Sequence, residues 1–203
     1  MPVSTTVQRR VFCRLALTVW AGQALGAAAA TPSAASNSSV LPKGAQAGDL
    51  LFRQGTERVS QLVLSVDSGA FSHVGMLVGQ PGAWQVLHAT PSERSGQPDG
   101  VVLDPLDFYL APERSRIHRL YQVQSVNNHA RARAVQWAMQ QQGRGFQMMD
   151  EGNGTYCTLL VWQAWQQAGL DLEVPFKEIT IPILQGRYLM PSALSQSRKL
   201  VAL

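Results

Sequence analysis

The chain has 203 residues, of which 45% are hydrophobic and 15% are charged, and its formal net charge is +4. Three of the basic residues, Arg9, Arg10 and Arg14, stand in an N-terminal segment that is typical of an export signal. Without them 14 basic and 13 acidic residues remain, so the rest of the chain is close to neutral. The positive net charge of the whole chain therefore gives no reason to expect binding to nucleic acid or to an anionic membrane.

The first 30 residues are predicted to be a cleaved signal peptide. A basic stretch is followed by residues 15–30, which carry no charge, are rich in Ala and Leu, and end in four alanines. An apolar stretch of roughly 16 residues is short for a membrane span, which needs about 20. We expect export to the periplasm by the Sec route or, given the paired arginines, by the twin-arginine route. An uncleaved anchor is the alternative, and no stable membrane insertion is expected after cleavage.

Residues 31–43 are rich in Ser, Ala and Pro, and they are expected to form a flexible lead-in to one domain at 44–203. The predicted elements then follow in chain order. A short strand is predicted at 50–52, a helix with Thr56 as its N-cap at 56–66, strands at 71–78 and 84–89, and a polar loop at 91–100. The helix is indicated by apolar residues with helical spacing.

The second half of the domain adds two strands and two helices. The strands are predicted at 100–103 and 116–121, and the first helix runs from its cap at Asn128 to about residue 142. The last helix is predicted to begin at Cys157 and to end near residue 168, where Gly169 stops it. This pattern predicts an α+β fold, a mostly antiparallel sheet packed against helices.

Cys157 is the residue that says most about function. Cleavage of the signal peptide would remove Cys13 and leave Cys157 as the single thiol, without a disulfide partner. In the first turn of a helix the thiol meets the positive end of the helix dipole, which predicts a depressed pKa and a nucleophilic thiolate. His73 and His88 lie in predicted strands, and a lone cysteine with separate histidines indicates a hydrolase nucleophile. The alternative is an inert buried thiol.

Five short motifs give the chain a family resemblance. They are Gly-Asp-Leu-Leu-Phe at 48–52, Ser-His-Val-Gly at 72–75, Asp-Pro-Leu at 104–106, Tyr-Cys-Thr at 156–158 and Met-Pro-Ser-Ala-Leu at 190–194. In this order they resemble the YiiX/YebB-like proteins, a permuted branch of the NlpC-type papain-like cysteine hydrolases, over about residues 45–197. The resemblance implies a circularly permuted papain-like fold with Cys157 as nucleophile, His73 as base and His88 as the residue that orients the His73 ring. The permuted order leaves the chemistry intact, because geometry defines a triad.

The chain departs from the family's pattern at the third triad position, where this branch often has glutamate and the sequence has His88. A neutral imidazole can still accept a hydrogen bond from the ring of His73. The alternatives for a charged partner are Glu93, Asp99 and Asp104.

Two more residues are candidates for contacts with substrate. The resemblance implies that Tyr156 borders the site, where its hydroxyl or the backbone N–H of Cys157 could stabilise an oxyanion, and we favour the N–H. Asp49 is a candidate for a contact beside the site, and its alternative is a purely structural role in holding that loop.

The sequence has no ligand spacing typical of a metal site and no glycine-rich phosphate loop, so we expect neither a metal nor a cofactor. We expect an exported cysteine hydrolase that cleaves an amide, ester or thioester bond through an acyl-enzyme on Cys157. The expected substrate is a peptidoglycan peptide or a lipid or other acyl compound. The main alternative is a catalytically silent module that binds a peptide or lipid in the same groove, and the second is a structural envelope protein without a groove.

Overall fold

The computed structural model describes residues 41–148, 154–182 and 184–203. The predicted signal peptide, with Cys13, and most of the predicted lead-in lie outside these residues. All described residues belong to one unit, which spans residues 35–203. No helix within the described ranges combines the length and the apolar character that crossing a membrane requires.

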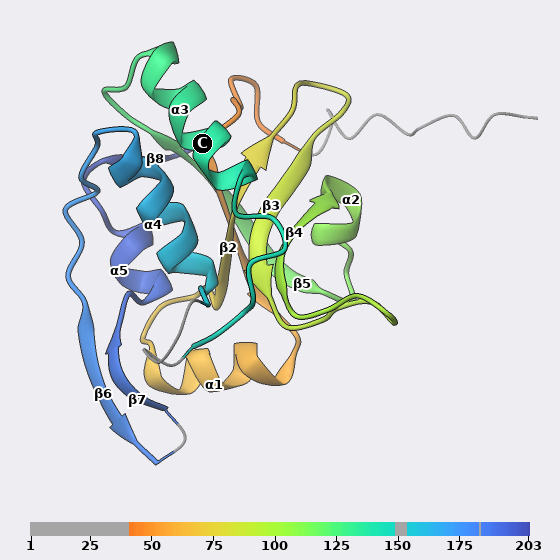
Figure 1. Cartoon of the computed structure of the whole chain (residues 1–203), viewed down its shortest axis with the longest axis vertical. Coiled ribbons are helices and arrows are strands. Elements are labelled where there is room, and N and C mark those ends of the chain that lie inside the picture. The colour runs from red at the N-terminus through yellow and green to blue at the C-terminus, as the bar shows by residue number, and fades with distance from the viewer. Residues whose placement is uncertain (1–40, 149–153, 183) are drawn as a thin grey trace, which may run out of the picture. The chain divides into compact units, whose positions relative to one another are not determined.

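A six-stranded antiparallel sheet with the order β4-β3-β2-β1-β5-β8 forms the centre of this unit (Figure 1). The strands are β1 (Leu50–Gly55), β2 (His73–Val78), β3 (Gln85–Thr90), β4 (Gly100–Pro105), β5 (Ser115–Val123) and β8 (Leu200–Ala202). β1, β2 and β3 are buried along nearly their whole length, and the runs at 50–52 and 74–78 are continuously apolar instead of alternating.

Helices cover both faces of the sheet. They are α1 (Arg58–Val66), α2 (Leu106–Tyr109), α3 (Asn128–Met139), α4 (Cys157–Gln167) and α5 (Pro191–Ser195). α3 and α4 pack on one face, over Val74 and Met76, and form the main core (Figure 1). α2 packs on the other face, over Leu77 and Val86. Because side chains alternate along a strand, β2 contributes to both cores.

A hairpin of β6 (Lys177–Ile181) and β7 (Leu184–Tyr188) forms a separate two-stranded antiparallel sheet. A third and smaller core joins this hairpin to α1 through Val63, Ile179 and Leu184. The same core places α1 and β7 as apolar walls of a cleft that also contains the start of α4.

The predicted α+β fold is confirmed, and the predicted strands and helices are present with ends that differ by a few residues. Both predicted N-caps are wrong by one position. Glu57, not Thr56, precedes the first helical residue of α1, and the Thr56 hydroxyl donates to a backbone oxygen of a neighbouring loop. Asn127 caps α3 by accepting the N–H of Ala130, so Asn128 is already helical.

Gly75 lies in the middle of β2, where a side chain has no room. A Cβ atom there would collide with the Val86 side chain and lie 3.1 Å from the backbone oxygen of Leu87 and 3.2 Å from Cβ of His88. Gly75→Ala should therefore lower the free energy of unfolding by about 1–3 kcal/mol, because relief requires a shift of β3. Urea denaturation checks this, with Gly145→Ala as control, since that position has open space. Equal midpoints for the two variants would contradict the packing argument.

Candidate active site

The start of α4 and the start of β2 meet in one cleft. Cys157 is the first residue of α4 and His73 the first of β2, and both line a cleft with about 470 Å³ of empty space, part of it open to solvent. The structure thus brings the predicted nucleophile and the predicted base to one place. Among the described contacts no hydrogen bond joins the Cys157 thiol to the His73 ring. In free enzymes such bonds are often long and shorten when substrate binds.

The thiol of Cys157 is enclosed by protein, although the residue as a whole is partly exposed. Burial raises the pKa of this thiol, and it outweighs the backbone N–H groups of Val74 and Thr158, which favour the thiolate. The depressed pKa predicted from the helix dipole is therefore wrong for the ligand-free chain. The backbone N–H groups at the start of the helix act in the predicted direction, but loss of water around the sulfur is the larger effect.

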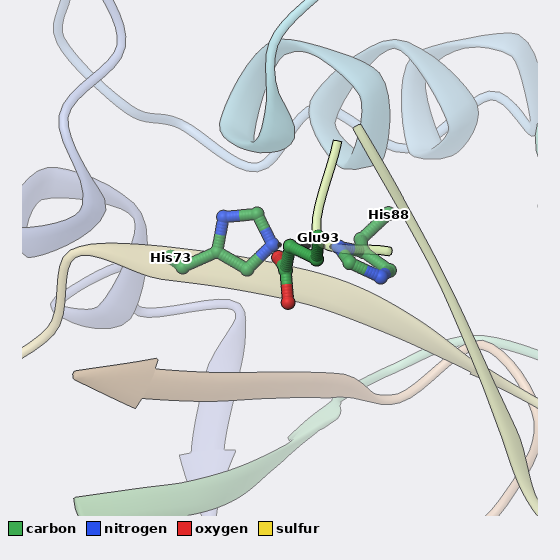
Figure 2. Close-up of side chains that lie close together, drawn as sticks. All are labelled: His73, His88 and Glu93. Atoms are coloured by element: carbon green, nitrogen blue, oxygen red, sulfur yellow. Dashed lines mark hydrogen bonds between the residues drawn. The ribbon is translucent and has the colours of Figure 1, made fainter. Parts of the chain in front are cut away.

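His73 and His88 form a buried pair. Nε2 of His73 and Nδ1 of His88 are 2.8 Å apart, and the two rings are nearly perpendicular, at 84°. Figure 2 shows the rings side by side, with the second nitrogen of His73 pointing away from His88. Burial lowers the pKa of both imidazoles, and the positive charge of Arg53 lowers it further, so both are neutral at pH 7. This geometry suits the role expected for His88, which is to hold the His73 ring.

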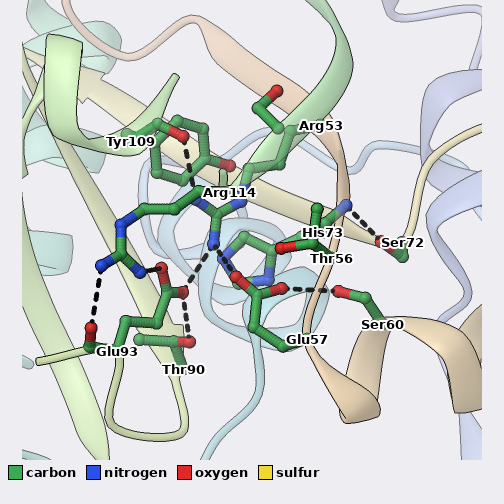
Figure 3. A network of polar contacts seen from close by, with 12 residues as sticks. Arg53, Thr56, Glu57, Ser60, Ser72, His73, Thr90, Glu93, Tyr109 and Arg114 are labelled. Atoms are coloured by element: carbon green, nitrogen blue, oxygen red, sulfur yellow. Dashed lines mark hydrogen bonds and ion pairs between the residues drawn. The ribbon is translucent and has the colours of Figure 1, made fainter. Parts of the chain in front are cut away.

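A buried arginine, Arg53, stands beside the imidazole pair and is not among the residues singled out from the sequence. It pairs with His73 in the register of β1 and β2 and is 1% exposed. Its guanidinium donates to the Glu93 carboxylate at 2.5 Å and to the backbone oxygen of Tyr109 at 2.8 Å (Figure 3). Arg114 donates to the same carboxylate at 3.2 Å. The feature of the sequence that could have drawn attention to Arg53 is a charged residue directly after the apolar run of a predicted strand.

Tyr109, at the end of α2, packs against both imidazoles and is likewise not among the residues expected from the sequence. The centre of its ring lies 5.0 Å from that of His88 and 5.9 Å from that of His73. Burial raises the pKa of its hydroxyl, which donates to the backbone oxygen of Leu51 at 3.0 Å. Tyr109 therefore acts as a fixed wall of the site and has no proton to offer to a substrate.

The three acids considered as charged partners have three different environments. Asp104 accepts a hydrogen bond from the His88 ring, with 3.1 Å between Oδ2 and Nε2. Glu93 is engaged by arginines, and Asp99 accepts the backbone N–H of Ser92 within its loop. Asp104 is therefore the acid that contacts the histidine pair, one step beyond the third triad position.

Tyr156 lines the cleft next to Cys157, as expected. Its hydroxyl accepts the backbone N–H of Leu189 at 3.1 Å, which ties the start of α4 to the segment after β7. As the N-cap of α4, Tyr156 makes no side-chain capping bond. The first N–H groups of a helix have no partner within it, so the backbone N–H of Cys157 remains the better candidate for an oxyanion donor.

Asp49 does not lie in the cleft, which corrects its assignment as a substrate contact. It is fully buried just before β1, with 2.6 Å between its Oδ1 and Nη1 of Arg131 on α3. It also accepts the backbone N–H of Gln46 at 2.9 Å. The structural alternative for Asp49 is therefore the one that fits, since this carboxylate joins the loop before β1 to α3.

One group of side chains in the described part of the chain has donor atoms close enough to consider a metal ion, namely His73, His88 and Glu93, whose atoms lie within 4.8 Å of one another. The two facing imidazole nitrogens already share a hydrogen bond. The Glu93 carboxylate accepts from Arg53 and Arg114. A divalent cation would have to replace these bonds and sit beside two guanidinium groups, so this arrangement does not fit a metal ion.

Comparison with known proteins adds to this geometry. The model of one family, described as permuted papain-like amidase enzyme, YaeF/YiiX, C92 family, matches residues 44–185. The chain is also similar to the crystal structure of the metalloprotein YiiX from Escherichia coli O157:H7, with a TM-score of 0.64 and 18% sequence identity. That match covers 78% of this chain and 96% of the other, and at this identity it shows the fold alone. No curated protein sequence matches the chain. The permuted papain-like fold expected from the motifs is confirmed.

The raised pKa of Cys157 predicts how the thiol reacts with pH in the absence of substrate. Because the thiolate is the reactive form, alkylation by iodoacetamide should be slow at pH 6 and rise about tenfold per pH unit up to pH 8 or beyond. The rate is followed at Cys157 by peptide mass spectrometry, with the chain unfolded in urea as control. In urea the rate should level off near the ordinary thiol pKa of about 8.5, earlier than in the folded chain. A plateau of fast labelling below pH 6 would indicate a preformed thiolate instead.

Proposed function

The chain belongs to the permuted papain-like amidases of the YaeF/YiiX, C92 family, and from this premise we propose that it is a cysteine hydrolase acting through an acyl-enzyme on Cys157. The observation that carries the proposal is the cleft shared by Cys157 and His73, each at the start of a well-packed element. A nucleophile and a base held on rigid elements are what acyl transfer requires.

In the proposed reaction, Sγ of Cys157 attacks the carbonyl carbon of the substrate while His73 takes the thiol proton. The bond to the leaving group then breaks, the leaving group receives this proton, and the acyl group remains on sulfur as a thioester. Water attacks the thioester next and gives one proton to His73, which returns it to the departing thiolate. A carboxylic acid leaves and the thiol is restored. The raised pKa of Cys157 and the lowered pKa of His73 suit a neutral pair in which proton transfer accompanies attack.

The lining of the cleft favours a substrate with an apolar acyl group. Apart from the reactive pair it consists mainly of aliphatic and aromatic side chains, among them Val59, Val63 and Leu184. No Asp, Glu, Lys or Arg of the described residues belongs to it. Peptidoglycan peptides carry charged groups, which such a wall would leave without partners. We therefore favour an amide, ester or thioester of an apolar acid over a peptidoglycan peptide.

We also propose that the protein works outside the cytoplasm, in the periplasm. This rests on the basic and then apolar pattern of the first 30 residues and on the four alanines that end it. An envelope location would give the cleft access to lipids and lipoproteins as sources of acyl groups.

The structural relative from Escherichia coli is described as a metalloprotein. For the present chain we propose a mechanism without a metal step. The atoms of His73, His88 and Glu93 that could act as ligands are committed to one another and to Arg53 and Arg114.

The acyl-enzyme is the decisive intermediate to detect. The chain is mixed with p-nitrophenyl butyrate, quenched in acid and weighed intact by mass spectrometry. We expect a mass increase of one butyryl group at Cys157 during the initial burst, because the thioester forms before water hydrolyses it. Cys157→Ala should show neither the adduct nor the burst. Cys13→Ser is the matched control and should behave like the parent chain, since Cys13 lies in the predicted signal peptide. A parent chain that binds the ester without acylation would favour the silent binding module.

Chain-length preference tests the apolar wall. Each methylene that enters an apolar site contributes about 0.8 kcal/mol, so kcat/KM should rise roughly fourfold per methylene from the acetyl to the hexanoyl ester. Val59, on α1, lines the cleft and is only partly buried, so Val59→Trp should fill the cleft and abolish this gain while activity on the acetyl ester persists. Ser65→Trp, exposed on the same helix and outside the lining, is the control. A flat profile in the parent chain would remove the acyl preference.

A further inference from the structure

Three buried side chains form a continuous row of hydrogen bonds that begins at the base. Nε2 of His73 lies 2.8 Å from Nδ1 of His88, and Nε2 of His88 lies 3.1 Å from Oδ2 of Asp104. His88 and Asp104 are at most 1% exposed, and His73 is 6% exposed. The three residues come from β2, β3 and β4, three neighbouring strands of the sheet. Figure 2 shows the first two rings of this row.

The number of protons in the row allows only one arrangement. An ionised carboxylate accepts hydrogen bonds and donates none, so the bond between Asp104 and His88 needs a proton on Nε2 of His88. A neutral imidazole has a single N–H, which leaves Nδ1 of His88 with a lone pair. That lone pair requires Nε2 of His73 to be the donor in the next bond. Nδ1 of His73 is then free of a proton, which is the state that a general base must have.

This assignment of protons requires that both imidazole rings are neutral, and both are. Burial lowers the pKa of His73 and His88, and the charge of Arg53, which is held by β1 next to His73, acts in the same direction. A doubly protonated ring would donate at both nitrogens and remove the constraint. The bond that Asp104 accepts from His88 therefore determines which nitrogen of His73 carries the proton.

Asp104 itself is held from its other side. Nη2 of Arg94 lies 2.8 Å from Oδ1 of Asp104, while Oδ2 faces His88. The Arg94 guanidinium also stacks over the ring of Phe108, 3.6 Å from its centre. Since arginine only donates, the atom of residue 104 that faces Arg94 must be an acceptor. This contact fixes which face of residue 104 is presented to His88.

We propose that Asp104 is a positioning residue of the hydrolase, which selects the tautomer of His88 and thereby leaves Nδ1 of His73 unprotonated to act as the base. This role rests on the function proposed for Cys157 and His73, and it extends the expected triad by a fourth member that never touches the substrate. Arg94 supports the role from the surface end of the row.

Asp104→Asn is the most informative variant, because it replaces one oxygen by an amide nitrogen and should reverse the direction of both hydrogen bonds in the row. Its carbonyl oxygen should turn to Arg94, so that its amide group donates to Nε2 of His88. The proton of His88 then moves to Nδ1, and the proton of His73 moves to Nδ1 as well. The measurement is a proton–nitrogen correlation spectrum of the chain labelled at its four histidines, which reports the protonated nitrogen of each ring. With p-nitrophenyl butyrate as the probe, kcat should fall about 10²–10⁴-fold with little change in KM, as expected for a wrong tautomer.

Rescue separates this role from a merely structural one. In the double variant Arg94→Ala with Asp104→Asn, nothing forces the carbonyl oxygen away from His88, so the original tautomers and at least about tenfold of the lost kcat should return. Arg94→Ala alone keeps the carboxylate and should lose less than about tenfold, since Arg94 is partly exposed. Asp107→Asn, exposed on α2, is the control and should match the parent chain.

The outcomes are distinct. Relocation of both protons in Asp104→Asn, with return in the double variant, supports the role of Asp104. A His88 ring that keeps its proton on Nε2 in Asp104→Asn, or an unchanged kcat, overturns it. If Asp104→Asn does not fold, the parent spectrum decides, because a proton on Nδ1 of His73 there also overturns the role. A parent chain with the expected tautomers but without any acyl-enzyme would refute the proposed function and leave the row intact.

Discussion

The buried guanidinium of Arg53 is the interaction on which the arrangement of the site depends. A charge removed from water needs a counter-charge and hydrogen-bond acceptors. Glu93 supplies the charge and the backbone oxygen of Tyr109 supplies an acceptor, so the loop after β3 and the end of α2 are both drawn to β1. Burial lowers the pKa of His73, and the same positive charge beside the ring lowers it further. One buried guanidinium thus holds the Glu93 loop and the end of α2 against β1 and helps to keep the base neutral.

The parts of the fold that depend on local pattern could be predicted from the sequence. Apart from α2, the strands and helices between residues 50 and 168 follow from apolar periodicity and from turn residues, and Cys157 and His73 stand out by residue type and motif. The closeness of His73 and His88 can also be predicted from the sequence. The hairpin of β2 and β3 pairs Met76 with Leu87, which brings His88 close to the start of β2. The elements α2, β6, β7, α5 and β8 are too short to show a periodic pattern of apolar residues in the sequence.

What escaped prediction depends on contacts between segments that are distant in sequence. A single arginine after an apolar run is usually exposed, and the burial of Arg53 depends on partners that are distant in the sequence, Glu93 and the backbone oxygen of Tyr109. The bond from His88 to Asp104 needs the pairing of β3 with β4. The pKa of Cys157 shows the same limit, since the helix dipole can be read from a sequence but the burial of the sulfur beside β2 cannot. Local charge effects were therefore predicted with the right sign and then outweighed by desolvation.

The order of the elements has a consequence for how the chain folds. The row from His73 to Asp104 spans three consecutive strands, with steps of 15 and 16 residues, so its contacts close short loops. Cys157 reaches the cleft only through a contact of much longer range, and such contacts form more slowly. Because synthesis proceeds from the N-terminus, the meander with its paired imidazoles can assemble while the thiol is still in unfolded chain. The permuted topology therefore delays the reactive centre until the C-terminal part has docked, and an incomplete chain has a base without a nucleophile.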